Sequence, residues 1–172
     1  DRPFLTPARR FRDWAAEALS PAGGRPLAAL MPGAGSPHRL WPPARFAEVA
    51  AHLAGKGYGI LIVGGPDALA ASRTIAEALP PDRVLNLAGS LSLGQTAAVL
   101  EKARLCVTPD TGVLHVACAV GTPTVSLFGS GLEKKWGPLG KRHVRINKGL
   151  PCSPCTRWSE TPPCPKDYAC MD

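Results

Sequence analysis

The sequence predicts an α/β fold, built as a Rossmann-like, doubly wound parallel sheet. From residue 27 onward, short apolar segments alternate with longer amphipathic segments, which is the pattern of βαβ units. Turns rich in glycine follow several of the apolar segments. A chain of 172 residues that is 45% hydrophobic can bury one sizeable core. Because crossovers are right-handed, we expect about five or six strands with helices on both faces.

The segment before residue 25 predicts a single helix. Apolar residues between Phe11 and Leu19 recur at helical spacing, and the stretch Pro21–Gly24 breaks the pattern. The chain opens abruptly at Asp1, so we expect it to be a piece of a longer protein.

Apolar runs predict the strands, because strands that are covered on both faces need no polar alternation. The expected strands are residues 27–31, 58–63, 83–87, 105–108, 124–128 and 143–146. Apolar residues at helical spacing, bounded by proline and glycine, predict the helices. The expected helices are residues 42–56, 66–79, 93–103 and 112–120.

Four turns should meet at one edge of this sheet, where the parallel strands end and ligands bind. They are Gly33–Ser36, Gly64–Asp67, Ala88–Ser90 and Asp110–Gly112. We expect them to line one crevice.

The turn at Asp110 carries the most informative pattern. It joins a buried strand to a helix that Asp110 or Thr111 could cap, and Gly112 allows a close backbone approach. His115 lies one turn further, on the side of Thr111. The free N–H groups and dipole of a helix start attract anions. This pattern predicts a site for a phosphorylated ligand.

The charge also favours anionic partners. Twenty Lys and Arg residues stand against 13 Asp and Glu, a net charge of +7, which suits phosphates or an anionic membrane surface. The basic residues are dispersed and only 6% of residues are aromatic, so we expect no nucleic-acid partner.

Residues 150–172 form a cysteine-rich tail that also contains several prolines. Its cysteines are Cys152, Cys155, Cys164 and Cys170. Three interpretations stay open: four thiolates that hold zinc or iron, two disulfides, which a cytosolic setting disfavours, or four reduced thiols. The spacing of the last two cysteines is less regular than that of a zinc ribbon.

Five segments in the same order resemble glycosyltransferase family 9, the bacterial heptosyltransferases of the lipopolysaccharide inner core. The fourth is similar to the family's Asp-[Ser/Thr]-Gly-x-x-His-x-Ala signature, and the likeness covers residues 27–171. The five segments are Pro32–Pro42, Gly64–Asp67, Asn86–Leu93, Asp110–Ala117 and Gly121–Gly129.

The resemblance implies half of a GT-B glycosyltransferase. Residues 25–149 would be the C-terminal domain, which binds the nucleotide-sugar donor, and residues 1–24 would be the linker from the acceptor domain. The catalytic base would lie in that missing domain, so this chain would have no catalytic residue and be inactive alone. The expected donor is ADP-heptose or a related ADP-sugar, and no cofactor is required for catalysis. The expected location is the cytoplasm, peripheral at the inner face of the inner membrane.

The resemblance also implies the donor-binding residues. Arg39 stands where the family usually has a lysine at the diphosphate, Asp67 would accept from ribose hydroxyls, and Leu91 would pack on adenine. Several have a structural alternative. Arg39 could be an ordinary surface arginine, and Asp67 or Asp110 could be a helix cap. Leu91 could pack in the core, and His115 could be a structural histidine. The full set is Gly33, Gly35, Ser36, Arg39, Asp67, Leu91, Asp110, Thr111, Gly112 and His115.

A second class of function stays open. The chain could be a non-catalytic α/β module, stapled by a metal at the cysteine tail, that binds nucleic acid or a protein partner. A donor domain predicts selective binding of ADP, whereas the module predicts nucleic-acid binding that falls steeply with salt.

Overall fold

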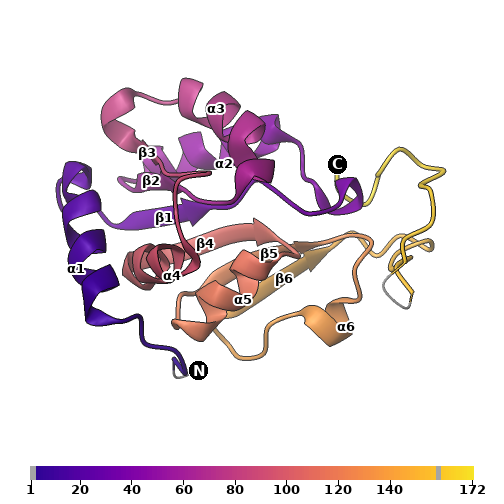
Figure 1. The fold of residues 1–172 in the computed structure, drawn as a ribbon. Helices are drawn as coiled ribbons and strands as arrows, with labels where there is room; N and C mark the ends of the chain where they lie inside the picture. The colour runs from indigo at the N-terminus through magenta and orange to yellow at the C-terminus, as the bar shows by residue number, and fades with distance from the viewer. Residues whose placement is uncertain (1–2, 158–159) are drawn as a thin grey trace.

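Six parallel strands form one sheet in the order β3-β2-β1-β4-β5-β6 (Figure 1). The computed structural model describes residues 3–157 and 160–172. This strand order reverses direction between β1 and β4, as in a doubly wound fold, so the predicted fold class is confirmed. The strands are β1 (Leu27–Leu30), β2 (Gly59–Ile62), β3 (Val84–Asn86), β4 (Ala103–Pro109), β5 (Thr124–Phe128) and β6 (His143–Asn147).

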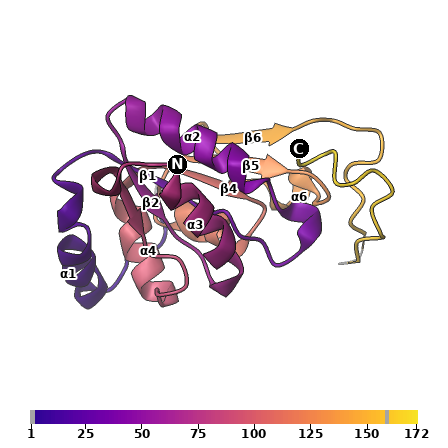
Figure 2. The same cartoon turned by 90° about the horizontal axis from the view of Figure 1, so that it is seen from above.

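Helices cover both faces of the sheet. In Figure 1, α2 and α3 lie above the strands, and α4 and α5 lie below them with α1 beside α4; Figure 2 shows α2 and α3 from above. The helices are α1 (Arg9–Ala18), α2 (Pro43–Gly55), α3 (Leu69–Glu77), α4 (Leu93–Lys102), α5 (Gly112–Ala119) and α6 (Glu133–Trp136).

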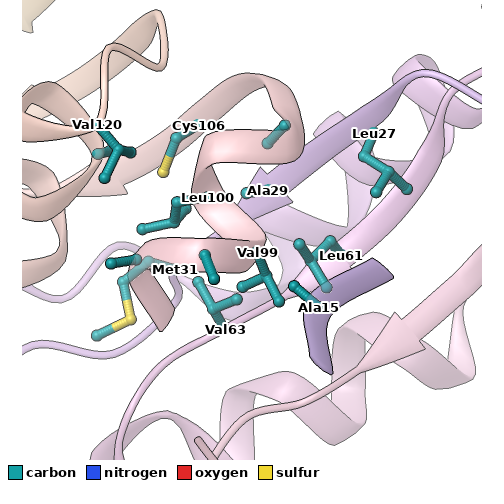
Figure 3. Close-up of a cluster of buried hydrophobic side chains, with 14 of the residues drawn as sticks. Ala15, Leu27, Ala29, Met31, Leu61, Val63, Val99, Leu100, Cys106 and Val120 are labelled. Carbon is teal, nitrogen blue, oxygen red and sulfur yellow. The ribbon is translucent and has the colours of Figure 1, made fainter. Parts of the chain in front are cut away.

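The pleat of the central strands separates two hydrophobic clusters. Ala29 and Leu61 point to the side of α1 and α4, where they pack with Val99 and Leu100 (Figure 3). Their neighbours along the strands point to the opposite side and pack against Phe46 and other side chains of α2 and α3. Successive side chains of a strand face opposite ways, so continuous apolar runs supply both clusters.

Local sequence explains where the helices begin and end. The Ser92 hydroxyl accepts from the backbone N–H of Gln95, and the Gln95 side chain accepts from the Ser92 N–H at 2.9 Å, which is a capping box at the start of α4. Pro43 occupies the first position of α2, where its missing N–H costs nothing. Gly57, with φ of +90°, lets the chain turn after α2.

The main differences from the sequence prediction are two changed boundaries and one unpredicted helix. Residues 66–68 form a 3₁₀ turn before α3 instead of its first α-helical turn. Strand β4 begins at Ala103, which we expected to end the preceding helix. Helix α6 was not predicted, because four residues, three of them charged or polar, are too short to show a periodicity.

The cysteine-rich tail runs beyond the carboxyl ends of the strands (Figure 1). Residues 157 and 160 pair in a single antiparallel bridge. The Ser153 hydroxyl donates to the Gly129 carbonyl, and Met171 is buried against the backbone of Gly129. The tail is therefore fastened to the turn that follows β5. None of the helices in the described part of the chain is long and apolar enough to cross a membrane.

Candidate functional site

Two adjoining clefts open where β1, β2 and β4 end. The first, which we call the apolar cleft, has a volume of about 660 Å³. The second, the polar cleft, has a volume of about 630 Å³. Gly35, Arg39, Thr111 and Gly112 line both clefts, so these four residues stand where the two meet.

Each cleft also has residues of its own. The apolar cleft is lined by Met31, Gly64, Gly65, Asp67, Leu91, Leu93, Thr96, Val113 and Val116. The polar cleft is lined by Ser36, Pro37, His38, Asp110, His115, Gly131, Trp136, Thr156 and Thr161. Nine of the ten donor residues expected from the sequence therefore line one cleft or both.

The remaining expected residue, Gly33, is buried behind this lining. A Cβ atom at Gly33 would lie 2.7 Å from a carboxylate oxygen of Asp67 and 3.0 Å from the Cβ of Ala68. Glycine is needed there so that the turn carrying Asp67 can pack closely on the end of β1. Gly33 thus shapes the apolar cleft from beneath.

Asp110 is the most constrained polar residue of the site. It is 6% exposed, and its carboxylate lies against the backbone of Gly131. Nη1 of Arg39 donates to the backbone carbonyl of Asp110 at 2.9 Å and lies 3.9 Å from its carboxylate. Burial raises the pKa of Asp110, while the charges of Arg39 and His115 oppose that rise. A hydroxyl donated to this carboxylate by a ligand would replace the lost solvation.

The start of α5 is left without a side-chain cap. Thr111 is the N-cap residue, but its hydroxyl lies 3.2 Å from that of Thr108 and accepts no bond from the helix backbone. The expectation that Asp110 or Thr111 caps this helix is therefore wrong. A Cβ atom at Gly112 would meet nothing within 4 Å. The helix start therefore has no side-chain cap and lies where the two clefts meet, an arrangement suited to binding anions.

The turn after β2 places Asp67 at the mouth of the apolar cleft. Asp67 is exposed and makes no capping hydrogen bond to the turn or to α3, so the helix-cap alternative for this residue is not seen. Leu91 is half-buried: it packs against the core cluster and lines the cleft as well. The core-packing alternative for Leu91 is therefore seen, and packing on adenine stays a prediction. The turn at residues 88–90 lies at the same edge but lines neither cleft.

Sequence reasoning missed several residues of the polar cleft. The ring of Trp136 lies 6.2 Å from that of exposed His115, and Trp136 comes from the unpredicted helix α6. Thr156 and Thr161 come from the cysteine-rich tail. Neither segment has a periodicity that would place it, and Trp136 is brought to His115 only by the fold.

The four tail cysteines are free thiols in this structure. Burial raises the pKa of Cys155 and Cys170, and the neighbouring cysteines contribute to the rise in both. The backbone N–H of Tyr168 donates to Sγ of Cys164 at 3.3 Å. Within residues 3–157 and 160–172, no group of three or more His, Cys, Asp or Glu side chains is placed to hold a metal ion. The thiols are near one another, but neither a metal site nor a disulfide is formed.

Comparison with known proteins gives a consistent result. The model of "Glycosyltransferase family 9 (heptosyltransferase)" matches residues 6–164. The chain is 33% identical over 141 residues to lipopolysaccharide heptosyltransferase 1 of Pseudomonas aeruginosa, which covers 78% of this chain and 37% of that protein.

Solved structures share the fold. The ADP-heptose lipopolysaccharide heptosyltransferase II of Escherichia coli superposes with a TM-score of 0.75 at 28% identity, covering 83% of this chain and 44% of that one. The iron-containing dodecameric glycosyltransferase TibC of enterotoxigenic E. coli has a TM-score of 0.64 at 18% identity, covering 86% and 42%. The chain therefore spans less than half the length of these proteins.

Proposed function

This chain belongs to glycosyltransferase family 9, and we propose that it is the half of such an enzyme that binds the nucleotide-sugar donor, an ADP-heptose or a related ADP-sugar. The observation that carries the proposal is the junction of the two clefts. An arginine, an uncapped helix start and two glycines meet there, between one apolar and one polar cleft. A nucleotide sugar has the same order of parts: a flat apolar base, two phosphates and a polyhydroxylated sugar.

The diphosphate would lie at the junction. The guanidinium of Arg39 is already directed at the start of α5 by its bond to the Asp110 carbonyl, and arginine pairs well with phosphate oxygens. The N–H groups after Thr111 add hydrogen bonds and the positive end of the helix dipole. Gly35 and Gly112 leave room for the phosphates to approach the backbone.

The base and ribose would occupy the apolar cleft. Leu91, Val113 and Val116 offer the apolar surface on which a purine ring packs, and exposed Asp67 can accept hydrogen bonds from the ribose hydroxyls. The sugar would lie in the polar cleft beside Asp110 and His115. This assignment places the buried carboxylate of Asp110 next to the hydroxyl donors that would best satisfy it.

These groups suggest what the chain contributes to catalysis. In an inverting transfer, an acceptor hydroxyl attacks the anomeric carbon of the sugar, and the nucleoside diphosphate leaves with the bonding electrons. Arg39 and the start of α5 would stabilise the charge that develops on the departing diphosphate. The base that takes the acceptor proton would lie in an acceptor half outside this chain. We therefore expect no turnover from the chain alone, and we place the whole enzyme at the inner face of the inner membrane.

Calorimetric titration with ADP, UDP and GDP tests the proposal. We expect ADP to bind, to compete with ADP-heptose, and to bind more tightly than UDP or GDP. Binding of none of the three nucleotides would refute the donor assignment. Tight, strongly salt-dependent binding of DNA or RNA without ADP binding would instead support the module alternative.

We propose further that the tail cysteines Cys152, Cys155, Cys164 and Cys170 gather around one structural zinc or iron ion. Its support is proximity: the neighbouring thiols contribute to the raised pKa of Cys155 and Cys170, and a backbone N–H donates to Sγ of Cys164. The described side chains do not form a ligand set as they stand, so metal binding would require the tail to close around the ion. The fold relative TibC is described as containing iron. Metal analysis of chain purified without chelator should find about one ion per chain, lost in Cys155→Ser. Four titratable thiols and no bound metal would contradict it.

A further inference from the structure

The cysteine-rich tail contributes a wall to the polar cleft. Residues 157 and 160 pair through two backbone hydrogen bonds of 2.8 Å, each N–H donating to the other's carbonyl. Thr156 and Thr161 flank this pair and therefore face each other, with their hydroxyl oxygens 2.9 Å apart. Both side chains are partly exposed and line the polar cleft together with residues predicted from the sequence.

Three contacts hold this wall against the sheet edge. The N–H of Thr156 donates to the Ser130 carbonyl at 2.9 Å, and the Ser153 hydroxyl donates to the Gly129 carbonyl. On the other side, Nε2 of His38 lies 3.0 Å from the Pro162 carbonyl. Since His38 immediately precedes Arg39, the tail is joined both to the turn after β5 and to the turn that carries the phosphate-binding arginine.

His38 also makes a ring contact that strengthens this connection. Its ring packs edge-on against Tyr168, with centroids 5.1 Å apart, and its Nδ1 lies 3.4 Å from the Ser36 hydroxyl. The histidine thus spans from one polar-cleft residue to two parts of the tail. The position of the threonine pair relative to Arg39 is fixed by contacts on both sides.

We propose that Thr156 and Thr161 are specificity-determining residues that recognise hydroxyl groups of the transferred sugar. Two threonines that hydrogen-bond to each other still have one O–H donor and free lone pairs to offer. Sugar hydroxyls also donate and accept, so they match this pair better than phosphate oxygens do, which only accept. The inference rests on the proposed donor function. It adds two sugar-binding residues that lie outside the Asp-[Ser/Thr]-Gly-x-x-His-x-Ala signature.

The geometry separates the tail from the nucleotide. Neither threonine lines the apolar cleft, and neither is among the four residues shared by the two clefts. Removal of their hydroxyls should therefore leave the affinity for ADP unchanged and lower only the affinity for ligands that carry the sugar. A general loosening of the site would weaken both, so the ratio of the two affinities distinguishes recognition from a structural effect.

The test compares the whole 172-residue chain with its Thr156→Val/Thr161→Val variant by calorimetry, with ADP and ADP-heptose as probes. Valine keeps the branched shape and removes the hydroxyl. We expect ADP affinity within twofold of the parent and ADP-heptose affinity about five- to tenfold weaker, the usual effect of lost hydrogen bonds. Thr156→Ser/Thr161→Ser should restore it, and Thr74→Val, on the exposed face of α3, should change neither affinity.

Each outcome has a distinct meaning. If the parent binds ADP, but binds ADP-heptose no better than the valine variant does, the inference is overturned and the donor function stands. Equal loss of ADP and ADP-heptose affinity in the variant also overturns it, since the pair would then be only a structural support. If the parent binds neither probe, the proposed function itself fails and the inference falls with it.

Discussion

Replacement of Arg39 by alanine tests the phosphate assignment most directly. The side chain is 33% exposed and lines both clefts. Within residues 3–157 and 160–172, its one hydrogen bond is to the Asp110 carbonyl, beside a 3.9 Å ion pair with the carboxylate of the same residue. One guanidinium N–H therefore fixes its direction while the others stay available to a ligand. The substitution removes a charge from the junction without filling the space.

The size of the effect follows from this geometry. Hydrogen bonds to charged groups contribute about 1.5–3 kcal/mol each, and a unit charge pair at about 4 Å near a protein surface gains roughly 4 kcal/mol before screening. Because Arg39 is one-third exposed, salt and water reduce the Coulomb part substantially. We expect a net loss of about 2 kcal/mol, which is an ADP affinity roughly 30-fold weaker.

Calorimetric titration with ADP at several salt concentrations measures both the loss and its electrostatic origin. Arg39→Ala should bind more weakly and with a smaller salt dependence, and Arg39→Lys should lie between the two because it keeps the charge and loses the planar fork. Arg45→Ala is the matched control, since Arg45 pairs with Glu48 on the surface of α2 and lines neither cleft. Unchanged ADP affinity in a folded Arg39→Ala chain would refute the assignment of the diphosphate to this junction.

Three further substitutions test the site and the fold. Asp110→Asn should raise the melting temperature at neutral pH. Burial raises the pKa of the Asp110 carboxyl, so the native chain loses stability as pH rises from the ordinary pKa of 3.8 through the raised pKa. In a pH series of melts the two chains should converge below 3.8, and a less stable variant at neutral pH would contradict this reasoning. Phe46→Ala removes a fully buried ring that packs 4.9 Å from that of Trp41; urea unfolding should show a loss of about 3–5 kcal/mol. Gly94→Ala would place its Cβ against the ring of Phe11. The melting temperature should therefore fall, although alanine is the better helix former. A rise would show that α1 can shift to make room for the added methyl group.

The strands could be predicted from the sequence because each one has a simple pattern. The runs ending at Leu30 and Ile62 are apolar and are followed by glycine turns, so both the strands and the edge at which they meet could be located. General rules of handedness predicted a doubly wound sheet, but the order of its strands comes from the structure. Helix α6 could not be predicted, because its four residues make about one turn and show no periodicity.

Individual side-chain contacts were harder to predict because they depend on residues far apart in the chain. The bond from Arg39 to the Asp110 carbonyl joins residues 71 positions apart. The Thr111 hydroxyl turns toward Thr108 instead of capping α5, a choice between two local partners that spacing alone does not decide. Gly33 and Gly35 look alike in the sequence, yet one packs under the Asp67 turn and the other lines both clefts.

The division of the site into two clefts with a shared junction has an evolutionary consequence. On the proposed assignment, the shared residues serve the diphosphate that every nucleotide sugar carries, while each remaining wall serves one end of the donor. Changes in base preference at the Asp67 turn and in sugar preference at the tail can then accumulate independently, because these two segments are distant in the chain. Exchange of residues 150–172 between two relatives should transfer the choice of sugar without the choice of nucleotide. The tail would then act as an interchangeable module beside a separate nucleotide-binding cleft.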